Sequence, residues 1–343
     1  MLSLRFPKGQ ADRFGTMKPL STGIRVSITI GLFAVLLSRL DGGRIADILS
    51  HGSPILFAAA VVALAATNFV VALRWRLVLA GRSQIERSAL LKILFTGWFF
   101  NQVLPTGIGG DAVRAWRCKL SGMNLATATT SILIDRASGY IVLVVIYATG
   151  LPALLAMLRD PRQQHLLVLV LGAAVCGLAA LFLSDRLPQV LRRLRPVAPL
   201  ANLSIEARRV LLEPRRAAPI FALTMIATGL TVLAVQLVGR SVNIDLTFGQ
   251  WLLIVPPVTL FQLLPLSLGG WGVREAAVVV ILAAFGIPGE TALAASLCVG
   301  LAQIVVGLPG GLIWLNNWDL PTREPGWRPL ALPEARGQAP SPS

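Results

Sequence analysis

Long apolar runs are the feature of this sequence that most restricts its fold. Inside a bilayer every backbone N–H and C=O must be hydrogen-bonded within the protein, so only helices and closed barrels can span it. A helix needs about 20 apolar residues to cross a hydrocarbon core of about 30 Å. Six runs approach or exceed this length: Ile24–Leu40, Pro54–Leu73, Ala137–Leu158, Leu166–Leu183, Ala217–Val238 and Thr291–Leu315. We therefore predict an all-α polytopic membrane protein with about six transmembrane helices.

The composition agrees with a membrane protein. Of the 343 residues, 55% are hydrophobic and only 14% are charged, a balance that a soluble domain of this length could not bury in its core. The net charge is +15, but the basic residues lie between the apolar runs rather than in one patch interleaved with aromatic residues. The predicted partners are therefore membrane lipids with anionic headgroups, and no nucleic acid is expected.

One unusual segment occurs twice. Gln102–Arg114 (QVLPTGIGGDAVR) recurs 160 positions later as Gln262–Arg274 (QLLPLSLGGWGVR). Proline and paired glycines interrupt helices, and each copy follows a shorter apolar run, Ala89–Leu104 or Trp251–Leu264. Broken helices at matching places in two halves of a transporter point to its binding site. We predict two re-entrant hairpins that enter the membrane without crossing it.

The basic loops predict which side of the membrane each part faces, because Lys and Arg near the ends of spans favour the cytoplasm. The two most basic loops are Arg74–Lys92 and Asp185–Arg216. Both can be cytoplasmic only if the first broken segment returns to its own side. The second broken segment then enters from the opposite face, which makes an inverted repeat. The alternative is eight simple spans, which would put the arginines of the second loop on the wrong side.

This topology divides the chain into four parts. Residues 1–23 form a cytoplasmic N-terminal segment, and residues 24–158 form a first membrane repeat with its re-entrant motif near 101–120. Residues 159–315 form the second repeat, with a re-entrant motif near 261–286 and the basic cytoplasmic loop 185–216. A short amphipathic surface helix is expected in that loop around Leu203–Leu212. Residues 316–343 are expected to be a disordered tail, and both termini lie on the cytoplasmic side of the inner membrane.

The two copies of the repeated segment are the candidate site. Asp111 is expected to cap a half-helix, whereas Trp271 stands at the same place in the second copy and leaves that helix start open to an anion. We predict that the amides of this second helix start, together with two arginines, bind a phosphate or similar headgroup. The predicted substrate-binding residues are Arg114, Arg274, Gly269, Gly270, Gly272, Asn101, Gln102 and Gln262.

A structural interpretation of the same charges stays open, because charged side chains inside a membrane usually pair with one another. The residues given a structural or ion-pair role are Pro105, Gly109, Gly110, Asp111, Asp135, Arg136, Pro265 and Glu275, and Arg114 and Arg274 could join those pairs. Asn68, Gln236 and Gln303 lie within apolar runs and are interpreted as hydrogen-bonding between helices.

The sequence contains no catalytic constellation, metal site or cofactor motif. His51 and His165 lie in short polar connections without Cys or carboxylate clusters nearby. Cys118, Cys176 and Cys298 are far apart and are interpreted as packing residues. No nucleophile motif adjoins an acid at membrane depth, and no ATP-binding loop is present. We predict that the chain is not an enzyme and binds no metal or cofactor.

The repeated motifs resemble those of a known family. Asn101–Arg114, then Asp135 and Arg136, then Pro265–Glu275 are similar to the transmembrane region of lysylphosphatidylglycerol synthases, also called the flippase-like domain family. The resemblance extends over about Ile24–Leu315. It implies a membrane region that moves a phospholipid between leaflets. Synthase activity, which resides in a separate cytoplasmic domain of the full-length synthases, is not expected here.

Three functions are open at this point. The leading hypothesis is a lipid translocase that moves an anionic or aminoacylated phospholipid, or a polyprenyl-linked lipid, between leaflets. The second is a membrane-embedded transferase that acts on a lipid phosphate with Asp111 or Glu275 as base. The third is an accessory subunit that docks a cytoplasmic lipid-modifying enzyme or glycosyltransferase on its basic loop.

Overall fold

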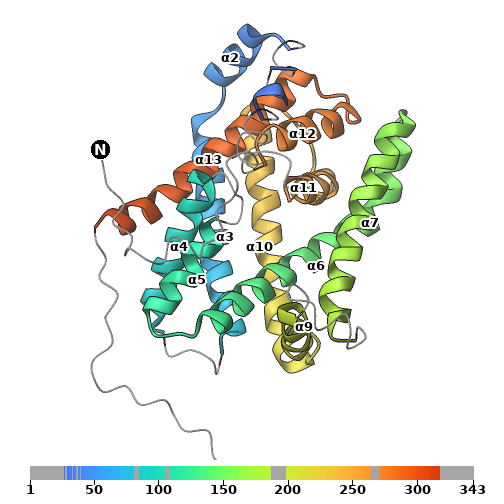
Figure 1. Ribbon diagram of the computed structural model, residues 1–343. Helices are drawn as coiled ribbons and strands as arrows, with labels where there is room; N and C mark the ends of the chain where they lie inside the picture. The colour runs from blue at the N-terminus through green and yellow to red at the C-terminus, as the bar shows by residue number, and fades with distance from the viewer. Residues whose placement is uncertain are drawn as a thin grey trace, which may run out of the picture.

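The computed structural model describes residues 27, 29–32, 34–35, 38, 40–80, 85–104, 109–186, 198–263 and 270–316 (Figure 1). Its helices are α2 (Gly42–Ser50), α3 (Pro54–Val78), α4 (Arg87–Val103), α5 (Gly109–Leu120), α6 (Leu125–Met157), α7 (Pro161–Leu183), the 3₁₀ turn η2 (Ser184–Arg186), α9 (Ala198–Leu211), α10 (Pro214–Ser241), α11 (Phe248–Gln262), α12 (Val273–Ala283) and α13 (Gly289–Leu315). No strand occurs within the described ranges, and the all-α prediction is confirmed.

Five helices are long and apolar enough to span a bilayer: α3, α6, α7 with η2, α10 and α13. They coincide with five of the six predicted spans, and the sixth, Ile24–Leu40, lies largely outside the described residues. Large apolar side chains cover the outer surface of these helices. Leu169 on α7 and Val62 on α3, for example, are each 68% exposed. Such extensive apolar surface is expected where helices face lipid.

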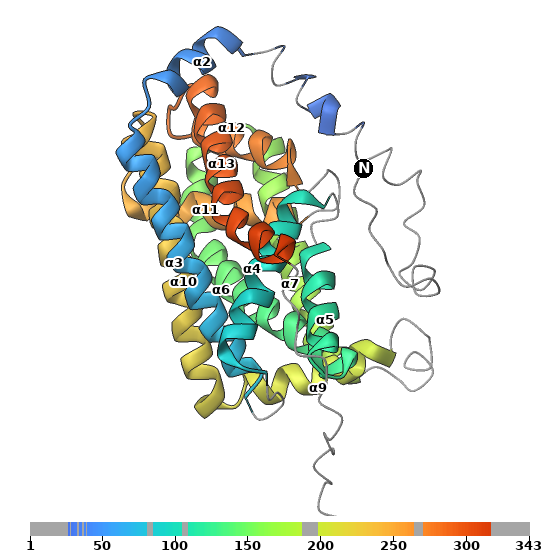
Figure 2. The same ribbon diagram turned by 90° about the vertical axis from the view of Figure 1, so that its left-hand side faces the viewer.

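Two pairs of short helices occupy the places predicted for the re-entrant hairpins. α4 has 17 residues and α11 has 15. At 1.5 Å per residue they are about 26 Å and about 22 Å long, which is less than the about 30 Å of a hydrocarbon core. Each is followed by a second short helix, α5 or α12, and Figure 2 shows α5 beside α4. Helices of this length do not support the eight-span alternative.

Close backbone packing holds the first hairpin together. The amide N–H of Gly110, at the start of α5, donates to the Asn101 Oδ1 atom of α4 at 2.9 Å. A Cβ atom on Gly110 would collide with the carbonyl oxygen of Gly97 on α4. Gly110, the second of the paired glycines, is therefore needed because the two backbones lie closer than a side chain allows.

Gly110→Ala is expected to destabilise the protein by about 1–3 kcal/mol, because the added methyl group must push the two helices apart. The matched control is Gly177→Ala on α7, where an added Cβ meets nothing within 4 Å. Because alanine favours a helix over glycine, the control should be neutral or slightly stabilising. Thermal unfolding in detergent, followed by fluorescence-detected gel filtration, compares the two. Equal midpoints for both variants would contradict the close packing.

The helices repeat along the chain at the spacing of the sequence motif. Shifting α4 by 160 positions gives residues 247–263, and α11 is Phe248–Gln262; shifting α3 gives 214–238, and α10 is Pro214–Ser241. The same shift relates α5 to α12 and α6 to α13. Each half of the protein therefore repeats one four-helix order.

Equivalent helices of the two repeats run in opposite directions. The N–H of Ser53, before α3, donates to the carbonyl of Ser241, the last residue of α10, at 2.9 Å. Near the other ends, Arg74 of α3 donates to Thr224 of α10 at 3.3 Å. The packing is also reciprocal, since α4 packs on α13 while α11 packs on α6. Figures 1 and 2 place the α11–α12 hairpin nearer α2 and the α4–α5 hairpin nearer α9. This is the arrangement of an inverted repeat.

Helix α11 differs from its equivalent α4 in one respect. Pro256 and Pro257 lie inside α11, at the positions that Thr96 and Gly97 occupy in α4. Both prolines are buried, within a helix whose N-terminus is held by a capping box between Thr247 and Gln250.

The described part of the second basic loop contains α9, which overlaps the predicted surface helix. One face of α9 is buried against neighbouring helices, and its residues are Leu203, Ala207, Val210 and Leu211. Ile205 is exposed. Asp185 accepts from Ser204 at 2.8 Å and pairs with Arg208 of α9. The other loop arginines named for partner docking, Arg192, Arg193 and Arg195, lie outside the described residues.

Candidate functional site

A cluster of charges lies between α3, α5 and α6. Asp135 of α6 is at its centre, with its side chain 3% exposed. Arg74 of α3 donates from Nε to Asp135 Oδ1 at 2.8 Å, and Arg114 Nη2 lies 3.6 Å from Asp135 Oδ2. Asp111 is the second acid of the cluster and also pairs with two arginines: it accepts from Arg114 Nη1 at 3.3 Å and from Arg136 Nε at 2.7 Å. The pairing considered in the sequence analysis is thus present among the charges of the first repeat.

The aromatic ring of Trp75 orients Arg114. The guanidinium carbon of Arg114 lies 4.2 Å from the centre of that ring, and the Trp75 Nε1–H donates to Ser131 on α6 at 3.2 Å. Trp75 is fully buried, so its ring is fixed and provides a rigid face for the cation. Arg114 is therefore held in place by packing as well as by charge.

The cluster carries an excess of positive charge. Arg74, Arg114 and Arg136 face Asp111 and Asp135, which leaves one positive charge uncompensated within this set. Arg114 is 3% exposed, and its Nε and Nη2 atoms are buried without a hydrogen-bond partner. Buried donors of this kind are rare in native proteins, since each lost hydrogen bond is unfavourable. Arg114 is thus able to bind an additional acceptor.

A cavity of about 380 Å³ adjoins this cluster, and we call it the first cavity. Its volume lies within the range of small-molecule sites, about 300–1,000 Å³. Its polar lining includes Arg74, Asn101, Gln102, Arg114, Arg136 and Tyr140. The cavity thus brings the unsatisfied guanidinium of Arg114 together with amide and hydroxyl groups that can bind a polar ligand.

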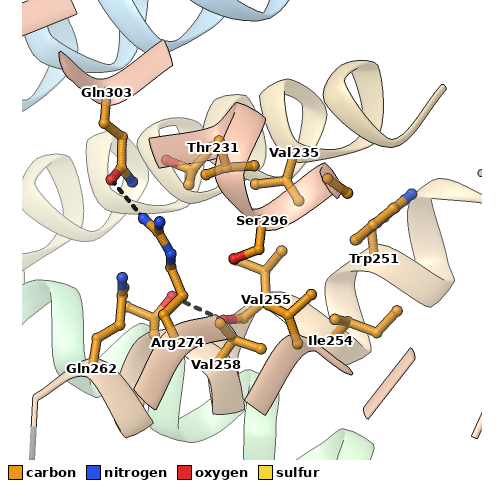
Figure 3. A pocket seen from close by; sticks show the side chains of 14 residues that line it. Thr231, Val235, Trp251, Ile254, Val255, Val258, Gln262, Arg274, Ser296 and Gln303 are labelled. Atoms are coloured by element: carbon orange, nitrogen blue, oxygen red, sulfur yellow. Dashed lines mark hydrogen bonds between the residues drawn. The ribbon is translucent and has the colours of Figure 1, made fainter. Parts of the chain in front are cut away.

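The second repeat contains a smaller, more neutral site around Arg274. Glu275, fully buried, accepts from Arg274 Nε at 2.9 Å and from the Gly272 N–H at 2.6 Å. Arg274 Nη1 donates to Gln303 at 3.3 Å, and Figure 3 shows Arg274 pointing toward Gln303. The adjoining second cavity has a volume of about 70 Å³. In this conformation the arginine is fully paired, and the space is too small for a headgroup.

The two cavities are equivalent in the repeat. Eight lining residues of the first are related by the 160-residue shift to lining residues of the second: Val71 to Thr231, Trp98 to Val258, Gln102 to Gln262, Arg114 to Arg274, Asp135 to Ala295, Arg136 to Ser296, Gly139 to Val299 and Leu143 to Gln303. Only the glutamine and the first arginine are kept in both. The repeats therefore share one site geometry but concentrate the charge in the first.

The structure places the residues predicted from the sequence in three groups. Asn101, Gln102 and Arg114 line the first cavity, and Gln262 and Arg274 line the second. Gly270 and Gly272 lie at the start of α12 with positive φ angles of 83° and 85°, which favour glycine. Pro105, Pro265 and Gly269 lie outside the described residues.

The sequence predicted a capped helix start in the first copy and an open one in the second, and both predictions were wrong. Helix α5 begins at Gly109, so Asp111 lies inside its first turn and pairs with arginines rather than capping the helix. In the second copy Glu275 accepts from the Gly272 N–H, so that helix start already has an anionic partner. The carboxylate reaches back one turn, which satisfies a free amide and neutralises Arg274 at the same time.

Two residues of these sites were missed or wrongly assigned in the sequence analysis. Arg74 was assigned to a cytoplasmic loop, but it lies within α3, is 7% exposed and pairs with Asp135. Arg74 directly follows the apolar run that ends at Leu73, and this position could have indicated that it belongs to the same helix. Gln303, interpreted as joining helices, does bond across helices, but its partner is the buried Arg274. Among the described residues, no group of three His, Cys, Asp or Glu side chains could hold a metal.

The sequence profile of the family described as the lysylphosphatidylglycerol synthase TM region matches residues 23–311. The chain belongs to this family. The match covers all of the residues that line both cavities, so the paired sites lie within the membrane region that defines the family. A comparison with curated proteins found no match. With its spanning helices, this family member is a multi-pass integral membrane protein.

Proposed function

We propose that this family member is a lipid translocase whose first cavity receives the anionic headgroup of a phospholipid or polyprenyl-linked lipid. The observation that supports this most directly is Arg114, a buried guanidinium with two nitrogens free of hydrogen-bond partners, beside a cavity of about 380 Å³. A phosphate oxygen can accept from these nitrogens, and it would also offset the one uncompensated positive charge of the cluster.

The physical task of a translocase is to shield a headgroup from hydrocarbon. An unpaired charge at the centre of a bilayer is unfavourable by several kcal/mol, so the path must be lined with polar groups while the acyl chains stay in lipid. The first cavity provides such a lining between helices whose outer surfaces are apolar. An inverted repeat supports alternating access, because its two halves can exchange conformations around one site.

The ion-paired acids favour transport over a transferase reaction. Glu275 is fully buried and bonded to Gly272 and Arg274, and Asp111 is bonded to two arginines. A general base must be able to reach the proton that it removes. Both carboxylates instead serve as fixed partners of cations. The charges of the loops support a location in the cytoplasmic membrane with both termini inside.

Arg114→Gln is expected to slow lipid translocation by about tenfold to a hundredfold, because a hydrogen bond to a charged group contributes about 1.5–3 kcal/mol. The fold should tolerate the change, since Asp135 keeps Arg74 and Asp111 keeps Arg136. Proteoliposomes containing fluorescent phosphatidylglycerol, phosphatidic acid or undecaprenyl phosphate report the exchange through quenching of the outer leaflet.

The matched control is Arg240→Gln, because Arg240 is an exposed arginine at the end of α10 and does not line either cavity. It should translocate lipid at the wild-type rate. If the wild-type protein moves none of the three lipids, or if Arg114→Gln moves them as fast as the wild type, the proposed function is wrong.

A further inference from the structure

Three residues line both cavities: Thr231 of α10, Thr259 of α11 and Gln303 of α13. We call this group the polar seam. All three are polar. Their equivalents in the first repeat, 160 positions earlier, are Val71, Phe99 and Leu143, which are all apolar. The two halves thus differ in polarity at the boundary between their cavities.

Each side chain of the seam is held in a defined position. Thr231 Oγ1 donates to the Ala227 carbonyl at 2.9 Å, and Thr259 Oγ1 donates to the Val255 carbonyl at 2.8 Å. Both hydroxyls can rotate so that the O–H points to a phosphate oxygen instead, and the side-chain amide of Gln303 also carries N–H donors. Gln303 accepts from Arg274, so the seam ends at the cation of the second cavity, as Figure 3 shows.

We propose that the polar seam is the route by which the headgroup passes from the first cavity to the second, where Arg274 receives it. This inference rests on the proposed translocase function. An apolar boundary between the cavities would strip a phosphate of all hydrogen-bond partners, which is strongly unfavourable in a medium of low polarity. Two hydroxyls and an amide lower that barrier without adding a charge that would trap the headgroup.

The unequal charge of the cavities gives the two ends of the route different roles. In the second cavity Ala295 and Ser296 replace Asp135 and Arg136, and Glu275 already neutralises Arg274. A phosphate is therefore held more weakly there than beside Arg114. The second cavity, at about 70 Å³, must also widen before a headgroup enters. The first cavity is the binding end of the route, and the second is the releasing end.

Conservative variants of the seam test the route. Thr231→Val with Thr259→Val removes two hydroxyls at nearly constant volume, and Gln303→Leu installs the residue of the first repeat. Gln303→Leu is expected to slow translocation by about tenfold, corresponding to one lost hydrogen-bonding partner in the passage, and the double threonine variant by about tenfold or more, because it removes two. Thr149→Val is the control, because Thr149 is exposed on α6 and bonds only to backbone carbonyls of its own helix.

Two measurements are made on every variant. One is the translocation rate in proteoliposomes of whichever of fluorescent phosphatidylglycerol, phosphatidic acid or undecaprenyl phosphate the wild type moves fastest. The other is the dissociation constant of dihexanoyl phosphatidylglycerol in detergent, which reports binding to the first cavity. Slow translocation with an unchanged dissociation constant supports the route.

The other outcomes overturn it. If the wild type moves lipid and the seam variants match its rate, the route is wrong while the translocase function stands. If the dissociation constant of a seam variant increases enough to account for the whole loss of translocation rate, the seam belongs to the binding site instead. If the wild type moves no lipid, the proposed function and the route fail together.

Discussion

Asp135→Asn is expected to destabilise the folded protein by about 3–5 kcal/mol, the typical effect of removing one partner from a buried ion pair. Asp135 is 2% exposed and lies against two guanidinium groups, Arg74 at 2.8 Å and Arg114 at 3.6 Å. Asparagine keeps the shape of the side chain but removes the negative charge. Arg74 would then lose the carboxylate that it pairs with, and Arg114 would keep Asp111.

Equilibrium unfolding in mixed detergent micelles measures this loss. The control is Asp245→Asn, at an exposed aspartate, and it should change stability by less than about 0.5 kcal/mol. Combining Asp135→Asn with Arg74→Met should recover part of the loss, because one unpaired cation is removed together with its partner. A single variant as stable as the wild type would mean that Asp135 does not neutralise these arginines.

Glu275→Gln is expected to be destabilising to a similar degree, by about 3–5 kcal/mol. Glu275 holds Arg274 through two bonds, at 2.9 Å and 2.5 Å, and also accepts from the Gly272 N–H at the start of α12. A glutamine keeps one acceptor oxygen, but it replaces the other with an NH₂ group and leaves the buried charge of Arg274 uncompensated. The second hairpin should therefore lose its fixed geometry before the rest of the protein unfolds.

The same unfolding measurement applies, with Glu213→Gln as the control. Glu213 forms an exposed pair with Arg216, and such pairs contribute about 0–1 kcal/mol. Hydrogen exchange should also show faster exchange of α12 amides in Glu275→Gln than in the control. The double variant Arg274→Met with Glu275→Gln should be more stable than Glu275→Gln alone. The opposite order would exclude the proposed pairing.

Most of the fold could be predicted from the sequence because a bilayer allows few backbone structures to span it. Five predicted spans are confirmed, and the short runs before Pro105 and Pro265 do become the short helices α4 and α11. The constant spacing of the motif predicted the repeat, and the antiparallel pairing of α3 with α10 agrees with its inversion. The orientation of the chain across the membrane stays a prediction from its loop charges.

The details of the site were harder to predict because they depend on contacts between distant residues. Asp135 and Arg74 are 61 positions apart, and no local pattern indicates that they meet. The cap predicted for Asp111 failed for a related reason, since two arginines attract its carboxylate more strongly than a free amide does. Arg114 was identified because the motif marked it, but its unsatisfied nitrogens became visible only in three dimensions.

The two prolines inside α11 bear on how the second cavity could change its size. Proline has no N–H, so Pro256 and Pro257 cannot donate to the carbonyls of Leu252 and Leu253, four residues earlier. A bend at that point therefore has two fewer backbone hydrogen bonds to break than the same bend in α4, where Thr96 and Gly97 have N–H groups. Val255 and Val258 on either side line the second cavity. Helix α11 therefore has fewer backbone hydrogen bonds to resist bending than α4, so we expect a change in the size of the second cavity to be concentrated in the C-terminal half.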